Sequence, residues 1–205
     1  MNLSIGYLPI SYYDFTPDAG GCFPFAVDIE VPYVVSFCDI YLPECDENFV
    51  PSWMENIKAY PLYFCAEVPN YFKDEYEEIL SAAQIEYRYL TEGKEQHISV
   101  ARIQHGKQLL AAFPFYITLG CGGETVVWGT KEDVFSVELR KWKGNWDGLI
   151  EKTIVIKPKV DTSIFWIGYD GNSIDVLSGQ RCFSTYENII KTLPEFVTPS
   201  LCEFE

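Results

Sequence analysis

The stretch PNYFKDEYEEILSAAQIEYRYLTEG, residues 69–93, decides the helical part of the fold. Asn70 can cap the start of a helix, and Gly93 can end it. Apolar side chains recur between them at three- and four-residue steps, namely Phe72, Tyr76, Ile79, Leu80, Ala83, Tyr87 and Leu90. This spacing is typical of a helix with one buried stripe, so we predict one long amphipathic helix over about residues 71–91.

Acidic side chains crowd this predicted helix and the loop before it. Four of them lie in the N-terminal half of the helix, where the helix dipole favours negative charge: Asp74, Glu75, Glu77 and Glu78. Three more lie in PECDEN, residues 43–48: Glu44, Asp46 and Glu47. The spacing of this second group does not match a calcium-binding EF-hand, so we expect a solvated loop there.

Strand patterns dominate the chain after His97. We predict strands over residues 97–103, 109–119, 125–130, 152–157, 163–169 and 173–178, separated by glycine-containing turns. Upstream, apolar residues occupy every odd position of residues 25–37. Pro32 interrupts that pattern, which indicates either an edge strand or two strands that meet at a bend.

Short helices complete the prediction. Capping boxes at Ser52 and Ser184 predict helices near residues 53–60 and 185–193, each ending before a proline. Residues 131–142 fit a helix or a strand, and we favour the helix. No repeat or linker divides the chain, so we expect one globular domain over residues 1–205, of α+β class with a mainly antiparallel sheet.

Composition excludes several classes of protein. The hydrophobic content of 48% is that of a globular chain, and the aromatic content of 16% favours a sheet-rich core. The longest apolar run, residues 109–117, is about half of the roughly 20 residues that a membrane helix needs. The N-terminus lacks the pattern of a signal peptide, and the seven cysteines are scattered, so we expect reduced thiols and a cytoplasmic location.

Charge is the global property that bears on partners. The chain has 30 acidic and 15 basic residues, a net charge of −15. Residues 1–95 hold 17 of the acidic and 4 of the basic residues. The electric field of so much negative charge repels nucleic acid and anionic lipid and attracts a basic protein. Negative charge can also serve solubility alone.

Cys121 lies between glycines in ITLGCGGETVVW, residues 117–128. Strand-like flanks on both sides favour a hairpin turn, because the glycines can adopt positive φ. A nucleophilic thiol would need a nearby cation or imidazole, and His97 and His105 are the two histidines of the chain. We favour the turn and keep a Cys121–His105 enzyme as the alternative.

Other motifs give weaker indications. No closely spaced pair of zinc ligands, phosphate-binding glycine loop or serine-hydrolase elbow is present, so we expect neither a metal nor a cofactor. RKWKGNWDG, residues 140–148, combines basic residues with Trp142 and Trp146. Such a patch can stack on a base or a sugar, but its turn signals favour an exposed loop.

Taken together, these patterns favour a binding protein. We expect an acidic surface that docks on a basic protein partner and occludes it, as an immunity protein occludes a nuclease toxin or a DNA mimic occludes a nucleic-acid-binding enzyme. The residues expected to carry it are Asp74, Glu75, Glu77 and Glu78, with Glu44, Asp46 and Glu47 as a second patch. The alternatives are the cysteine-dependent enzyme and a structural or assembly subunit.

Overall fold

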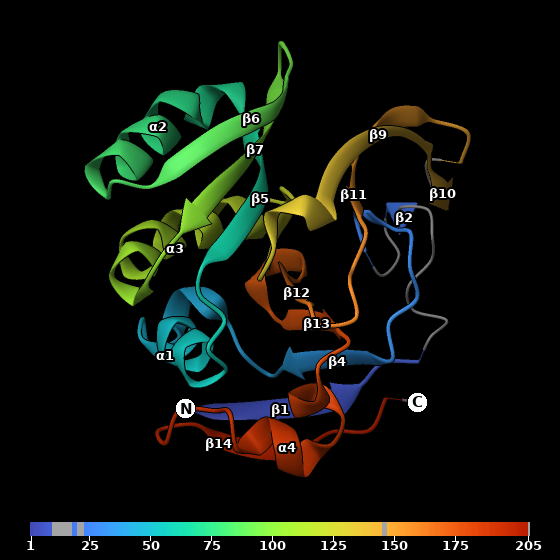
Figure 1. Cartoon of the computed structure of the whole chain (residues 1–205). Coiled ribbons are helices and arrows are strands. Elements are labelled where there is room, and N and C mark those ends of the chain that lie inside the picture. The colour runs from blue at the N-terminus through green and yellow to red at the C-terminus, as the bar shows by residue number, and fades with distance from the viewer. Residues whose placement is uncertain (10–17, 20–22, 145–146, 205) are drawn as a thin grey trace.

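A nine-stranded sheet forms the centre of the protein (Figure 1). The computed structural model describes residues 1–9, 18–19, 23–144 and 147–204. Neighbouring strands of this sheet are antiparallel, except that β14 runs parallel to β1, so the predicted antiparallel character is confirmed. In spatial order the strands are β14 (Thr198–Leu201), β1 (Asn2–Tyr7), β4 (Tyr33–Cys38), β13 (Ile174–Ser178), β12 (Ser163–Ile167), β8 (Val126–Gly129), β5 (Leu62–Pro69), β7 (Gln96–Ile103) and β6 (Glu86–Glu92).

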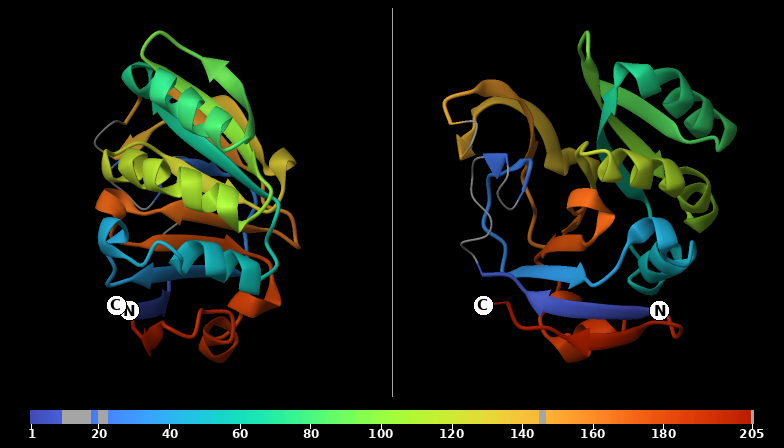
Figure 2. Two further views of the ribbon diagram at one scale, coloured as in Figure 1. Left: turned by 90° about the vertical axis from the view of Figure 1, so that its left-hand side faces the viewer. Right: turned by 180° about the vertical axis from the view of Figure 1, so that it is seen from behind.

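Helices and a smaller sheet cover the two faces of this central sheet. Helices α1 (Phe49–Asn56), α2 (Lys73–Ala82) and α3 (Gly106–Cys121) lie side by side on one face, as Figure 2 shows from their side. On the other face lies a three-stranded sheet in the order β3 (Ala26–Val27), β11 (Ile150–Ile156) and β9 (Phe135–Lys141). Strands β2 (Asp18–Ala19) and β10 (Lys143–Gly144) pair separately, and α4 (Tyr186–Ile190) lies beside β1 and β14.

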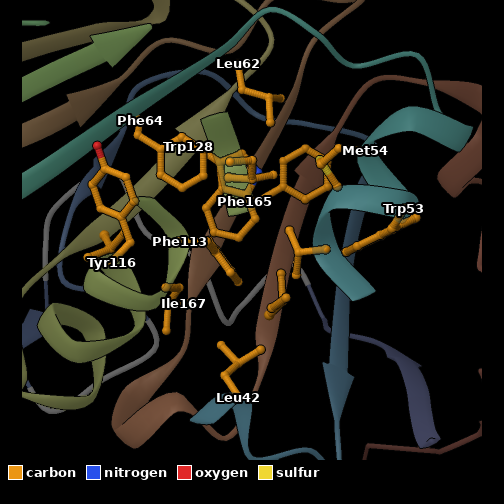
Figure 3. Close-up of a cluster of buried hydrophobic side chains, with 14 of the residues drawn as sticks. Leu42, Trp53, Met54, Leu62, Phe64, Phe113, Tyr116, Trp128, Phe165 and Ile167 are labelled. Carbon is orange, nitrogen blue, oxygen red and sulfur yellow. The ribbon is translucent and has the colours of Figure 1, made fainter. Parts of the chain in front are cut away.

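Alternating side chains of the central strands build two separate cores. On β5, Leu62, Phe64 and Ala66 enter the core under the helices, whereas Cys65 faces the smaller sheet. The Trp128 ring stacks on Phe64 and on Phe165, at centroid distances of 5.0 and 5.3 Å. Figure 3 shows these strand residues meeting side chains from α1 and α3. A sheet buried on both faces explains the high aromatic content.

The predicted helix over residues 71–91 is too long. A 3₁₀ turn (Asn70–Phe72) leads into α2, which ends at Ala82, and Gln84 adopts a left-handed φ of 54°. The chain then reverses into β6, which pairs with β7 at the edge of the sheet. Tyr87 and Leu90 fit the helical spacing, but strand pairing satisfies the backbone of this segment instead.

The strand predicted over residues 109–119 is wrong, because this segment belongs to α3. The side chains that α3 buries recur at helical spacing: Leu109, Ala112, Phe113, Tyr116 and Leu119. Cys121 therefore lies in the last helical turn and not in a hairpin turn. Among the described residues, no helix has both the length and the apolar character that a membrane span requires.

The structure decides between the alternatives left open for residues 131–142 and for the segment around Pro32. Residues 131–142 form a 3₁₀ turn (Glu132–Val134) and then β9, so the favoured helix is wrong and the strand is correct. Pro32 separates β3 from β4, which lie in different sheets, so the two-strand interpretation is correct. Helix α1 starts four residues earlier than predicted, and α4 lies within the predicted range.

Candidate functional site

The outward face of α3 carries almost no charge. Lys107 is the single charged residue of this 16-residue helix. Beyond it, the exposed or half-buried side chains of the helix are Leu110, Ala111, Pro114, Ile117, Thr118 and Cys121. A surface helix ordinarily presents charged residues to solvent, so this face is unusually suited to contact with another molecule.

A groove of about 530 Å³ runs between this face and the segment that leads into α1. We call it the α1–α3 groove. Buried side chains from both helices and from a preceding 3₁₀ turn (Leu42–Glu44) form its floor: Leu42, Phe49, Val50 and Phe113. Leu110, Pro114, Ile117 and Thr118 form the α3 wall. This volume lies within the roughly 300–1,000 Å³ of known ligand pockets.

Carboxylates of the predicted second patch lie at this groove. Asp46 and Glu47 line it, and both are exposed, as is the neighbouring Glu44. Asp46 Oδ1 accepts a hydrogen bond from the backbone N–H of Asn48 at 2.8 Å, which fixes the loop before α1. No Lys or Arg is among the residues lining the groove.

The predicted patch on α2 is only partly free. Asp74, Glu75 and Glu78 are exposed, and within the described part of the chain none of them has a Lys or Arg nitrogen within 4.0 Å. Glu77 differs, because it accepts a hydrogen bond from the Tyr89 hydroxyl at 2.9 Å and lies 4.0 Å from Lys73 Nζ. Three of the four predicted residues are thus available to a partner.

Acidic residues around the smaller sheet are instead neutralised by the protein itself. Arg140 Nη2 donates to both carboxylate oxygens of Asp28 at 2.8 Å, and Lys157 Nζ lies 2.7 Å from Glu138. Lys131 pairs with Asp161 at 2.6 Å, and Lys159 pairs with Asp133. The face that carries α1, α2, α3 and residues 42–47, which we call the helical face, differs from this surface. Its exposed carboxylates form no such ion pair within the described residues at Glu44, Asp46, Glu47, Asp74, Glu75 and Glu78.

Cys121 and His105 lie at opposite ends of α3. His105 is the N-cap residue, and its Nδ1 accepts a hydrogen bond from the Gln108 N–H at 3.4 Å. A helix of 16 residues separates the two residues by roughly 24 Å, so the two side chains that the alternative enzyme would use are not brought together. Burial and the nearby Asp170 raise the pKa of the Cys121 thiol, which makes the reactive thiolate scarce.

Sequence reasoning missed the groove and a buried acid on β13. The signal for the groove is the absence of charged residues from 108–121, a range that includes the strand predicted over residues 109–119. Asp175 is 7% exposed, and burial raises its pKa to about 6. Its Oδ2 accepts a hydrogen bond from Ser173 at 3.3 Å, whereas its Oδ1 has no hydrogen-bond partner within the described part of the chain. Nearby on the sheet, the sulfur atoms of Cys38 and Cys202 lie 4.0 Å apart.

Two further expectations concern metals and the tryptophan loop. The described residues contain no cluster of three or more His, Cys, Asp and Glu side chains that could hold a metal ion. Trp142 follows β9 and is half-buried, and Trp146 lies outside the described residues.

Comparison with known proteins finds no family model, no curated protein and no solved structure that matches this chain.

Proposed function

We propose that this protein is a binding protein whose acidic helical face docks on a basic protein partner and occludes it. An immunity protein that blocks a nuclease toxin acts in this way, as does a DNA mimic that blocks a nucleic-acid-binding enzyme. The observation that supports the proposal is the uneven pairing of charge. On the helical face, Asp74, Glu75 and Glu78 of α2 and Glu44, Asp46 and Glu47 before α1 form no ion pair within the described residues, whereas four acids around the smaller sheet, Asp28, Asp133, Glu138 and Asp161, are held by lysine or arginine.

Electrostatics explains what such a face does. An unpaired exposed carboxylate keeps its full field toward solvent, and several of one sign attract a basic protein over distances of about a Debye length, ~10 Å at moderate salt. This attraction mainly increases the association rate and selects for basic partners. The net charge of −15 at the same time repels nucleic acid and anionic membranes.

Neither alternative gains support of this kind. The cysteine-dependent enzyme loses its base, because His105 is at the far end of α3 from Cys121. No contact or surface described above favours an assembly subunit.

The test combines partner capture with charge reversal. Immobilised protein should retain a basic protein from source-cell lysate at low salt and release it as salt rises. Once that partner is purified, its association rate constant can be measured. It should be lower by about tenfold or more for the variant Asp74→Lys, Glu75→Lys, Glu78→Lys and should depend less on salt concentration. Stopped-flow or surface-based kinetics measures both quantities.

The matched control reverses three exposed acids outside the helical face, in the variant Glu30→Lys, Glu151→Lys, Glu203→Lys. It carries the same net charge as the test variant. Equal slowing in both variants would show that only net charge matters and would reject the helical face as the binding surface. Unchanged kinetics in the test variant would reject the proposal outright.

A further inference from the structure

We propose that the α1–α3 groove binds an apolar side chain of the partner, and that lysine or arginine residues flanking this anchor lie against the carboxylates of the groove. The inference deepens the proposed function, because it states what the basic partner must present. The occupant is therefore a peptide segment that combines an apolar anchor with basic neighbours.

The groove suits an apolar anchor because its floor is preformed. Phe113 points from α3 into the core, where its ring contacts Phe64 and Trp128 at centroid distances of 6.3 and 6.0 Å (Figure 3). On the opposite side, Phe49 stacks on Trp53 at 5.9 Å. Both sides of the floor are thus packed into the core, and a partner side chain enters without the cost of ordering a mobile surface. Such packed, desolvated pockets are where the strongest contacts of interfaces occur.

The charge around the groove requires a basic flank. Asp46 and Glu47 line it, and the C-terminal turn of α3 contributes Thr118, Cys121 and Gly122. The carbonyl groups at a helix C-terminus carry roughly half a negative charge, and α3 has no basic residue in its last turn. All charged groups of the lining are therefore of one sign, and a cation is the complementary neighbour.

The same charges argue against two other occupants. A second copy of this chain would bring two acidic surfaces together, since each copy carries a net charge of −15. A fatty acid would place its carboxylate against Asp46 and Glu47. A basic peptide segment meets neither objection.

The experiment selects binders from a displayed library of random dodecapeptides, with the full-length protein as bait at low salt. Enriched peptides should share an apolar residue flanked by Lys or Arg. Synthetic versions of these peptides are then measured by calorimetry or fluorescence anisotropy on the wild type and on the variants below.

Two kinds of variant separate the apolar from the charged contribution. Thr118 is exposed on the α3 wall, so Thr118→Trp should fill the groove and weaken the peptide about tenfold or more. Leu110→Lys, at the other end of this wall, replaces Thr118→Trp if that variant does not fold. Glu47→Lys should weaken the peptide about three- to fivefold and reduce the salt dependence of its affinity. The matched control, Glu151→Lys on β11, reverses the same charge at an exposed position outside the helical face and should change affinity less than twofold, as expected of a remote exposed charge.

Each other outcome overturns the inference. Apolar peptides without basic residues would indicate a site for a neutral apolar ligand. Equal affinity in Thr118→Trp and wild type would place the peptide elsewhere, and a library without enriched members would show that the groove selects no such segment. A partner protein whose binding depends on the α2 carboxylates but not on Thr118→Trp would leave the proposed function intact while rejecting the groove.

Discussion

Asp175 lies inside the central sheet, directly opposite Ser36 of the neighbouring strand β4. Burial raises the pKa of its carboxyl to about 6, and the Ser36 and Ser173 hydroxyls offset only part of this effect. The Asp175 carboxyl therefore binds its proton more tightly in the folded protein than in the unfolded chain. The contribution of Asp175 to the free energy of unfolding therefore falls as pH rises from about 4 through about 6. Above this range the contribution no longer changes with pH.

Asp175→Asn should remove this pH dependence. A shift of about two pKa units corresponds to about 3 kcal/mol, so the variant should gain up to that amount of unfolding free energy over the wild type at pH 7.5, and little at pH 4. Urea unfolding across this range measures the difference between the two proteins. Asp170→Asn, in the exposed turn after β12, controls for the loss of one formal charge. A constant difference between Asp175→Asn and wild type at all pH values would contradict the assignment.

Asp175 also shows what a single sequence conceals at this scale. The segment SIDVLS predicts a strand correctly. Its alternation normally means one buried and one solvated face, and it would place the acid in solvent. Here the smaller sheet and the helices bury β13 on both sides, and only the tertiary arrangement reveals this.

Helix α3 lies unusually close to the sheet at its C-terminal end. A Cβ atom added to Gly120 would lie 2.7 Å from Ile167 Cγ2 and 3.1 Å from Ile167 Cβ, on β12. Glycine at this position is therefore needed for packing, although it weakens the helix by about 1 kcal/mol relative to alanine.

Gly120→Ala should consequently destabilise the protein. The clash with Ile167 costs about 1–3 kcal/mol and the gain in helix propensity offsets about 1 kcal/mol, so unfolding free energy should fall by up to about 2 kcal/mol. Denaturant titration measures this change. Ala111→Gly, at an exposed position of the same helix, calibrates the propensity at about 1 kcal/mol. Stabilisation of Gly120→Ala by that amount would disprove the close packing.

Short apolar runs between turn residues were predictable as strands, and the longer run of α3 was not predictable as a helix. Strands β7, β8, β11, β12 and β13 are rich in β-branched and aromatic residues and are bounded by turn residues, so they could be found from sequence although β8, β12 and β13 are buried at every position. Residues 109–117 form a nearly continuous apolar run that contains Pro114, and periodicity cannot assign such a run to a helix or a strand. The acidic residues at positions 44, 46 and 47 were identified, but the groove beside them depends on α3 and so remained hidden.

Charge is distributed unevenly over the molecule as a whole. The acids around the smaller sheet form ion pairs, and the pairing with Lys159 and Lys131 lowers the pKa values of Asp133 and Asp161. The carboxylates of the helical face repel one another instead, which opposes the compact state.

Added salt should therefore stabilise the whole protein. The thermal midpoint should rise by a few degrees as ionic strength increases, because salt screens the self-repulsion of a chain with net charge −15.

The variant Glu44→Gln, Glu78→Gln should raise the midpoint at low salt and reduce its dependence on salt. The control Asp133→Asn, Asp161→Asn removes the same number of charges but breaks two ion pairs, and it should not raise the midpoint. Calorimetry at several salt concentrations measures all three proteins. If the midpoint of the control rose as much as that of the test variant, the location of the removed charges would not matter.

The alternation of side chains through the central sheet has an optical consequence. Trp128 points into the core under the helices, whereas Trp166 points into the core under the smaller sheet, where its ring contacts Phe23 and Phe25. The core under the helices thus contains the indoles of Trp53 and Trp128, and the core under the smaller sheet contains that of Trp166. A fluorescence signal from Trp128 or Trp166 alone reports whether its layer has separated from the sheet, so loosening of the helical layer can be distinguished from loosening of the strand layer in the same molecule.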